Sequence, residues 1–440
     1  MKLSFMNNAN PTLFYKQDVM CHFIIPHFDE YIIYSPRRGG AFVANNSAKF
    51  IIEKYINNQE LSEEEKKTKV FDYIQHLEKI DLFDLKTNNS IGMSRLIILL
   101  THMCNLSCTY CYSQKCRSTD IIGKDKLQTV IDYVFSNDNI SRNTLHFSFG
   151  GGGEPFTSWD LFVWTIEYIE SKAKKKSTDT KIQVVTNATI LDDTIANFLR
   201  EHNIKLTISF DILPEVQNKQ RSFTNKQFNS FYIVNKNIIN YMAYGIFGGI
   251  RSTITDMNVD LMLEMASFVR NNYPKINTLI FEPVSNNFAV NQSFYEKYVD
   301  QYFIAKDYCQ KNGISLSNSI EHSFFRIRDR FCPMEFCITP TGDIVSCHRI
   351  SSTNDVNYNF YHIGTVENNI NISKEQIQKV LQLTNKKNKK CDDCFAKWHC
   401  AGGCPVNRNL FSEIQQEDYC SFVKIFTKNI LVEKLKKAES

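Results

Sequence analysis

The segment RLIILLTHMCNLSCTYCY, residues 95–112, joins an apolar run to a loop that carries three closely spaced cysteines. The run from Arg95 to Thr101 has the nearly continuous apolar character of a buried parallel strand. Cys104, Cys108 and Cys111 follow, with three and then two residues between them. Three thiolates suit a four-iron cluster with one iron left open, whereas a structural zinc site takes four ligands. We therefore expect an iron–sulfur cluster on a loop directly after a strand.

Downstream of Ser94, short apolar runs alternate with longer amphipathic stretches, as expected when parallel strands are each followed by a helix. The predicted strands are residues 95–101, 145–149, 182–187, 206–210, 247–255 and 279–284. The predicted helices lie near residues 124–136, 159–172, 191–202, 226–243 and 258–271. Six strands with this alternation favour an α/β fold, a partial (β/α)6 TIM-like barrel, over a two-sided Rossmann sheet. In such a barrel the active site gathers at the carboxyl ends of the strands.

The loop CNLSCTYCY, residues 104–112, resembles the signature of the radical S-adenosylmethionine (SAM) superfamily, including the aromatic Tyr110 before the last cysteine. The resemblance implies that Cys104, Cys108 and Cys111 are catalytic and hold a SAM-binding 4Fe-4S cluster, whose open iron chelates the amino and carboxylate groups of SAM. One electron then cleaves SAM to a 5′-deoxyadenosyl radical, which removes hydrogen from unactivated positions. The electron implies a reductant such as flavodoxin or ferredoxin as a partner.

Residues after later strands resemble the SAM-binding positions of the same superfamily. The segment FSFGGGGEP is similar to the family's GGEP motif, so the backbone of Gly152, Gly153 and Glu154 is expected to approach the SAM amino group. The other ribose-binding and carboxylate-binding positions that the resemblance implies are Thr186, Asn187, Ser209, Asp211 and Arg221. For each residue taken singly, a turn, cap or surface role is the structural alternative. The chain departs from the family at Ala188 and Ile212, where Gly is usual.

A second group of cysteines lies near the C-terminus, in a pattern that resembles the SPASM domain. The matching cysteines are Cys332, Cys347, Cys391, Cys394, Cys400, Cys404 and Cys420. The resemblance implies two auxiliary 4Fe-4S clusters, one held by Cys332, Cys347 and Cys404 and the other by the remaining four cysteines. Cys337 is an eighth candidate metal ligand that would complete the first cluster or else be buried and inert. A zinc-binding module is the alternative for the whole group.

The segment FCITPTGDIVSCHRI, residues 336–350, predicts a strand, a turn at Gly342 and a second strand. The auxiliary clusters would accept an electron from a substrate radical, or they would be purely structural. Cys21, Cys116 and Cys309 match no motif and are interpreted as structural.

Residues 1–92 read as a separate unit of short strands followed by helical patterns from Asn46 to Tyr55 and from Glu63 to Leu82, which suggests a winged-helix-like domain. The segments 31–55 and 77–83 are similar to the small leader-peptide recognition domain of enzymes that modify ribosomally made peptides. Such domains bind a peptide by adding it as a strand to a sheet edge. The alternative is a purely structural cap. The predicted order is this domain at 1–92, the barrel at 93–310 and an iron–sulfur SPASM domain at 311–440.

The bulk composition is that of an ordinary globular protein, with 43% hydrophobic and 22% charged residues among 440. A net charge of +4 on so long a chain gives no argument for a nucleic-acid or membrane partner. Fourteen cysteines in short C-x-x-C-like spacings indicate metal ligation rather than disulfides. The N-terminal residues lack the apolar core of a signal peptide, so we expect a cytoplasmic, reducing compartment.

Together these resemblances predict a radical SAM oxidoreductase that modifies, by oxidation or cross-linking, a ribosomally made precursor peptide bound through its leader. One alternative is a radical SAM enzyme that acts on a folded protein, as sulfatase maturases do, or on a small metabolite. An aspartate commonly follows the equivalent of Cys347 in sulfatase maturases, and His348 stands there instead. The other alternative is a non-catalytic iron–sulfur protein that binds or transfers electrons, which the intact triad of Cys104, Cys108 and Cys111 disfavours. The residues do not select the bond that is formed.

Overall fold

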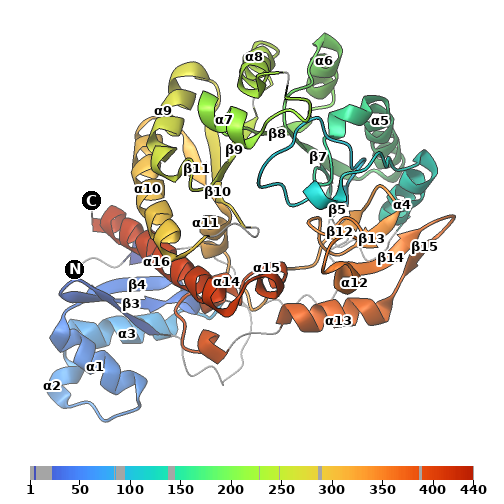
Figure 1. The fold of residues 1–440 in the computed structure, drawn as a ribbon. Helices are drawn as coiled ribbons and strands as arrows, with labels where there is room; N and C mark the ends of the chain where they lie inside the picture. The colour runs from blue at the N-terminus through green and yellow to red at the C-terminus, as the bar shows by residue number, and fades with distance from the viewer. Residues whose placement is uncertain are drawn as a thin grey trace.

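The computed structural model describes residues 4–5, 22–83, 85, 95–136, 144–226, 228–246, 248–285, 290–385 and 389–439 (Figure 1). Within these residues two sheets organise the chain, one of four strands and one of eleven. No helix of the described ranges is long and apolar enough to cross a membrane. Cys21 lies outside the described residues.

The large sheet contains the six predicted strands as parallel neighbours in chain order. They are β5 (Arg95–Ile98), β6 (Thr144–Phe149), β7 (Asp179–Thr186), β8 (Lys205–Ser209), β9 (Gly249–Ile254) and β10 (Thr278–Pro283). The helices that follow them lie around the outside of the strands in Figure 1. These helices are α4 (Lys124–Ser136), α5 (Trp159–Lys176), α6 (Asp193–Glu201), α7 (Pro214–Gln220), α8 (Ser230–Ala243), α9 (Met262–Asn272) and α10 (Gln292–Lys311). The prediction of an α/β protein with a largely parallel sheet, of the kind expected for a partial barrel, is confirmed.

Two predicted helices needed new bounds, and two further helices were not predicted. Helix α5 continues to Lys176, and α8 begins only at Ser230, where Asn229 caps it by accepting the backbone N–H of Tyr232 at 2.9 Å. Helices α7 and α10 were not predicted. Helix α7 has only seven residues, five of them polar, which gives a weak apolar period.

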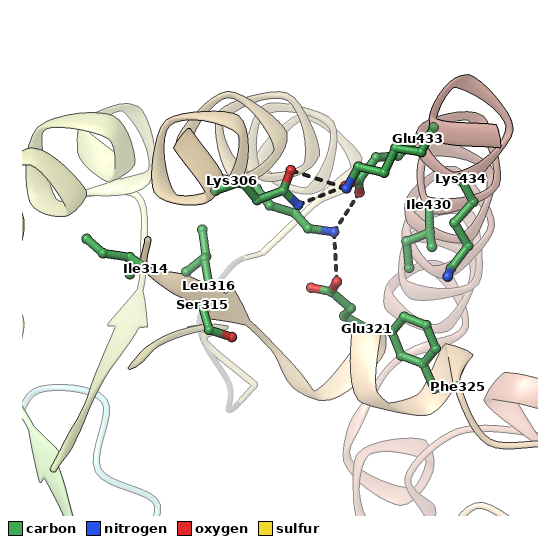
Figure 2. A pocket seen from close by; sticks show the side chains of 11 residues that line it. Lys306, Ile314, Ser315, Leu316, Glu321, Phe325, Ile430, Glu433 and Lys434 are labelled. Atoms are coloured by element: carbon green, nitrogen blue, oxygen red, sulfur yellow. Dashed lines mark hydrogen bonds and ion pairs between the residues drawn. The ribbon is translucent and has the colours of Figure 1, made fainter. Parts of the chain in front are cut away.

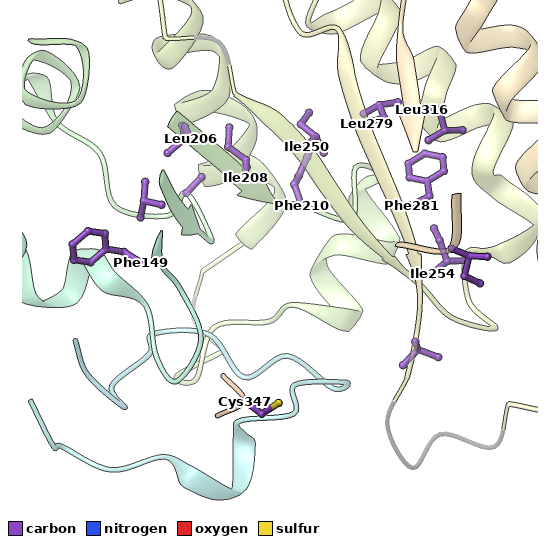
Figure 3. Close-up of a cluster of buried hydrophobic side chains, with 14 of the residues drawn as sticks. Phe149, Leu206, Ile208, Phe210, Ile250, Ile254, Leu279, Phe281, Leu316 and Cys347 are labelled. Carbon is purple, nitrogen blue, oxygen red and sulfur yellow. The ribbon is translucent and has the colours of Figure 1, made fainter. Parts of the chain in front are cut away.

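The strands of the large sheet have one apolar and one polar face, which explains why the sheet curves around a cavity. On β8 to β10 the apolar residues Leu206, Ile208, Ile250, Leu279 and Phe281 are buried beneath the helices (Figure 3). The residues between them line a cavity instead. Because successive side chains of a strand point to opposite faces, this alternation separates the packed face from the open one.

The large sheet is open and continues at both ends beyond the six strands. β11 (Ser315–Ser317) pairs in parallel with β10, and β12 (Phe336–Ile338) pairs in parallel with β5. The sheet then runs antiparallel through β13 (Asp343–Val345), β14 (His362–Val366) and β15 (Ile370–Ile372). The predicted strand, turn and strand at residues 336–350 are therefore confirmed, and Gly342 makes the turn with a φ of 93°.

The remaining elements after β10 are mostly short and surround the C-terminal cysteines. They are α11 (Ser319–Phe324), α12 (Tyr358–Tyr361), α13 (Lys374–Asn385), α14 (Lys397–Cys400), α15 (Pro405–Leu410) and α16 (Glu413–Glu439). The 3-10 helices of the described residues are Pro36–Arg38, Gln114–Cys116, Pro155–Ser158, Val259–Leu261 and Lys389–Cys391.

The small sheet forms the N-terminal unit. Its strands are antiparallel in the order β1 (Ser4–Phe5), β4 (Gly40–Ala44), β3 (Glu30–Ser35) and β2 (Phe23–His27). Helices α1 (Asn46–Ile56), α2 (Glu63–Lys66) and α3 (Lys69–Lys79) follow. The single helix predicted from Glu63 to Leu82 is therefore divided into two helices, α2 and α3. The break lies at Thr68, which caps α3 by accepting the N–H of Phe71 at 3.4 Å. The winged-helix-like description and the three domain boundaries stay predictions.

The N-terminal unit packs against the cysteine-rich part of the chain. The hydroxyl of Tyr34, on β3, lies 2.5 Å from Nε2 of His399, the residue before Cys400. The ring of Phe324 stacks on both, with centroid distances of 6.4 Å to Tyr34 and 4.7 Å to His399. The guanidinium of Arg37 lies 5.1 Å from the ring centre of Trp398. The small sheet is thus fixed beside α14 rather than hanging from a linker.

A buried ion-pair network joins α16 to the barrel helices (Figure 2). Lys306 on α10 is 6% exposed, and its ammonium lies 2.7 Å from Glu321 and 2.6 Å from Glu433. Burial raises the pKa of Glu433, but hydrogen bonds from Lys306, Lys437 and Gln310 outweigh it and lower that pKa to about 2. One ammonium therefore holds a carboxylate on each of two further helices.

Replacing Lys306 with Ala is expected to destabilise the protein by about 3 to 5 kcal/mol, because it leaves the buried Glu321 carboxylate without its cation, whereas Glu433 keeps Lys437. Urea unfolding followed by circular dichroism measures the loss. Lys311→Ala on the same helix is the matched control, because its partner Asp307 is 64% exposed and the pair contributes little. Equal unfolding midpoints for the two variants would contradict the prediction.

Candidate active site

The large sheet encloses a cavity of about 550 Å³ on its polar side. Ten predicted site residues line it: Cys104, Cys108, Cys111, Gly152, Gly153, Glu154, Thr186, Asn187, Ser209 and Arg221. Asp211, the remaining predicted SAM-binding residue, does not line the cavity and is fully buried. The barrel topology therefore brings residues from distant parts of the chain to one chamber.

The cysteine loop is held on both sides by backbone hydrogen bonds. Towards β6, the N–H groups of Gly153 and Glu154 donate to the carbonyls of Thr101 and Met103, each at 2.8 Å. On the other side, the N–H of Ser107 donates to the Ser222 carbonyl at 2.8 Å. The loop position is thus fixed before any cofactor binds.

The three thiols of this loop lie close enough to influence one another. Burial raises the pKa of Cys108 to about 12, and the nearby thiols of Cys111 and Cys104 raise it further, while Arg221 lowers it. Burial also raises the pKa of Cys104, which Arg117 lowers. Three thiols of one loop that share a cavity wall with Arg117 and Arg221 are the kind of donor set that a 4Fe-4S cluster with one open iron takes. The residues present fit the implied group.

The glycine loop after β6 comes so near the cysteine loop that only glycine fits at Gly153. A Cβ atom there would lie 1.9 Å from the Met103 carbonyl oxygen. Gly152 has a φ of 67°, a left-handed conformation that favours glycine. The run of glycines therefore has a structural cause, which is the contact between two loops.

The Glu154 carboxylate joins the glycine loop to the end of β7. It accepts the hydroxyl of Thr186 and the backbone N–H of Asn187, each at 2.7 Å, and the N–H of Phe156 at 3.3 Å. Burial raises its pKa, and these hydrogen bonds lower it. Because these donors occupy the carboxylate oxygens, Glu154 is placed to position the loop rather than to meet a ligand with its side chain.

Asp211 and Arg221 meet at the ring of Tyr110, the aromatic residue of the cysteine motif. The Tyr110 hydroxyl donates to Asp211 at 2.7 Å and accepts from Arg221 at 2.8 Å. Nε of Arg221 is buried and has no hydrogen-bond partner among the described residues. The network explains why an aromatic residue with a hydroxyl suits this position, and it leaves part of the guanidinium for a ligand.

The two departures from the family pattern both fall where the backbone is left-handed. Ala188 has a φ of 56° and Ile212 a φ of 66°. A β-branched residue in this region costs roughly 1–2 kcal/mol of local strain. Both side chains are fully buried, so packing offsets part of that cost. The backbone thus keeps the conformation for which glycine is suited, although glycine is absent.

Sequence analysis assigned no site role to several ionisable residues of the cavity, among them Arg117 and His348. Arg117 donates to the Gly152 carbonyl at 3.1 Å and to the sulfur of Cys111 at 3.3 Å. His348, noted in the sequence only as a departure from sulfatase maturases, pairs with Glu335 at 2.7 Å through Nδ1. Burial raises the pKa of Glu335, but His348 outweighs it and lowers that pKa to about 2. A single sequence carries no local signal for either contact, because both join residues of different loops or strands.

The C-terminal cysteines form two neighbourhoods. Burial raises the pKa of Cys347 well above its usual value, and the nearby thiols of Cys404 and Cys332 raise this pKa further. The thiols of Cys391 and Cys394 likewise raise the pKa values of Cys400 and Cys420. The two cluster ligand sets that the SPASM resemblance implies stay a prediction. Cys337 is fully buried among Ile97, Leu99 and Val345. The thiol of Cys347 is near enough to raise the pKa of Cys337.

The described cysteines are all free thiols. Among the described ranges, no three His, Cys, Asp or Glu side chains stand close enough to share one metal ion. Cys309 is buried on α10, and Cys116 donates to Asp355 at 3.4 Å, so both fit the structural role predicted for them.

A cysteine triad lies on the loop after a strand, and a glycine loop lies beside it at the same end of a parallel sheet. This arrangement suits a site for an iron–sulfur cluster and SAM. Residues 98–259 match the family model described as the Radical SAM superfamily. The chain therefore contains a radical SAM domain, the kind of domain that uses SAM and a 4Fe-4S cluster as cofactors.

Curated relatives include one of unknown activity and several maturases. The uncharacterized protein MJ0907 of Methanocaldococcus jannaschii is 29% identical over 178 residues, which is 40% of this chain and 59% of that protein. This chain therefore spans less than two thirds of that relative. A cysteine-type anaerobic sulfatase-maturating enzyme of Clostridium novyi is 23% identical over 77% of this chain and 96% of its own length.

Two solved structures share the fold. The structure of anSMEcpe with bound AdoMet and the Kp18Cys peptide has a TM-score of 0.66 at 18% identity, covering 78% of this chain and 99% of that one. Streptococcus suis SuiB bound to precursor peptide SuiA has a TM-score of 0.52 at 13% identity, covering 90% of this chain and 97% of that one.

Replacing Gly153 with Ala is expected to lower the iron content and SAM binding of the anaerobically reconstituted protein, because the added methyl group separates the two loops of the site. Iron analysis and equilibrium dialysis with SAM measure the change. Gly245→Ala is the control for a general loss of stability, because its φ of 76° strains the backbone while a Cβ there meets no atom within 4 Å. Full iron loading and SAM binding in Gly153→Ala would contradict the prediction.

Proposed function

We propose that this radical SAM enzyme oxidatively modifies a ribosomally made precursor peptide, and that it holds the peptide's leader with its N-terminal sheet. The observation that carries the peptide assignment is the small antiparallel sheet fixed beside the C-terminal cysteines by Tyr34 and His399. Among the described strands β2 pairs only with β3, so its outer edge can take an added strand. Pro26 on β2 suits an edge strand, since proline has no N–H for a central ladder.

The comparisons support a peptide substrate. Both solved relatives were determined with peptides, and the likeness to the SuiB complex covers 90% of this chain against 78% for anSMEcpe. The sulfatase-maturating relatives support a second candidate, the oxidation of a folded protein. His348 disfavours that candidate, because an aspartate is common at this position in sulfatase maturases.

In this proposal Cys104, Cys108 and Cys111 hold the SAM cluster, and the glycine loop, Thr186, Asn187, Ser209 and Arg221 hold SAM. Asp211 positions Tyr110 and Arg221. Cys332, Cys347 and Cys404 hold one auxiliary 4Fe-4S cluster. Cys391, Cys394, Cys400 and Cys420 hold the other. Cys337 lies in an apolar cluster and is given no ligand role, because two strands enclose it.

When bound, SAM and the clusters would supply one-electron chemistry: hydrogen abstraction from the peptide, with an auxiliary cluster as the acceptor of the second electron and solvent as the acceptor of the proton when the new bond forms. The protein's own residues orient and shield this chemistry. The buried walls around Cys108 exclude water, and the pairing with Glu335 fixes the ring of His348 at the chamber wall.

Changing Cys104, Cys108 or Cys111 to Ala is expected to abolish 5′-deoxyadenosine formation by the reconstituted protein with SAM and dithionite, because the cluster loses a ligand. Cys309→Ala is the control, since this thiol lies buried on α10 away from the chamber. Normal product from the triad variants would remove the catalytic assignment.

Mass spectrometry of short peptides encoded near the gene tests the substrate. A loss of about two hydrogens supports peptide oxidation, whereas modification of a sulfatase alone supports the second candidate.

Replacing Arg117 with Gln is expected to shift the midpoint potential of the SAM cluster to a more negative value. The change removes a positive charge and an N–H···S hydrogen bond from Cys111, and both stabilise the reduced cluster. A redox titration followed by electron paramagnetic resonance measures the shift. Arg117→Lys keeps the charge and is expected to shift the potential less. Equal potentials in all three proteins would show that this contact does not tune the cluster.

A further inference from the structure

The inner wall of the large sheet is unusually polar. A closed (β/α)8 barrel is normally filled by layers of branched apolar side chains. Here the inward positions of β6 to β9 carry Ser148, Gln183, Thr207, Ser209 and Arg251, and they line an open chamber. A polar, unfilled interior is suited to holding a polar ligand.

Arg251 differs from the other arginines of this chamber. Arg95 donates to Ser148 at 2.9 Å, Arg117 to the Gly152 carbonyl and Arg221 to Tyr110. Within the part of the chain that the structure describes, the Arg251 side chain makes no hydrogen bond or ion pair, and it is exposed to the cavity. A guanidinium has five donors in a planar fork, so this one is ready for a planar anion.

Among the described residues, the carboxylates that line the chamber with Arg251, those of Glu154, Glu282 and Glu335, already have partners of their own. On one side β9 pairs with β8, which places Ser209 beside Arg251, and on the other side Ile280 of β10 is its neighbour. Glu282, further along β10, is already engaged by Ser319, whose N–H and hydroxyl lie 2.8 and 2.9 Å from its oxygens. The cation and the adjacent hydroxyl therefore face the chamber without an internal counter-ion.

We propose that Arg251 anchors a carboxylate-binding subsite that takes an acidic group of the substrate. Arg251 lies three residues before the end of β9, whereas the cysteine and glycine loops lie beyond the strand ends. Its neighbour Ser209 is a predicted SAM-binding residue, so the subsite is on the wall of the chamber and adjoins the expected position of SAM. The inference rests on the proposed function, because it takes this chamber to be where the substrate binds. The acidic group is a side-chain or C-terminal carboxylate of a peptide.

Arginine labelling tests the subsite without any turnover. The reconstituted full-length protein is treated with phenylglyoxal in the presence of succinate, of succinamide as the uncharged match, or of SAM. Peptide mapping by mass spectrometry then follows the adduct on Arg251, and Arg251→Lys identifies the mapped peptide. Succinate is expected to slow labelling of Arg251 by about threefold or more relative to succinamide, because only the carboxylate forms the paired hydrogen bonds.

Three other outcomes would overturn the proposal. Equal labelling in succinate and succinamide would show that no carboxylate binds there. Protection by SAM would assign the subsite to the cofactor's own carboxylate. Faster labelling of Arg95 and Arg221 than of Arg251 would show that Arg251 is not the free guanidinium of the chamber. Because no peptide is modified in this experiment, its result is independent of whether the peptide oxidation itself is found.

Discussion

The site depends above all on the contact between the cysteine loop after β5 and the glycine loop after β6. Two backbone hydrogen bonds, from Gly153 to Thr101 and from Glu154 to Met103, join the loops. Glu154 then extends the connection to β7 through Thr186 and Asn187. Three strand ends are thereby fixed to one another by groups that are not themselves reactive. A buried carboxylate is costly unless its oxygens are satisfied, and here three donors satisfy them.

Much of the fold follows from patterns that the sequence displays locally. Runs of alternating or continuous apolar residues locate β5 to β10, because a sheet with helices on its outer face must bury them. The cysteine spacing likewise locates the reactive loop, since closely spaced thiols on one loop can meet one cluster. The short polar helix α7 lacks such a pattern. The parallel pairing of β12 with β5 joins segments more than two hundred residues apart, and no local pattern specifies a pairing at that distance.

The candidate site was predictable where a motif is contiguous and hidden where contacts cross between elements. Cys104, Gly153 and Asn187 stand in recognisable short motifs. Arg117, Glu335 and Arg251 do not, because their roles depend on which loop or strand lies opposite. Ala188 and Ile212 give a third case. Their identities suggest a changed backbone, but tertiary packing keeps the left-handed conformation in spite of the unfavourable residue type.

The ladder between β5 and β12 ties the two cysteine-bearing halves of the molecule into a single frame. The strand that leads into Cys104 and the hairpin that ends at Cys347 share this ladder, so neither can slide without breaking main-chain hydrogen bonds. The loop that carries Cys104 and the hairpin that precedes Cys347 therefore keep a fixed position relative to one another.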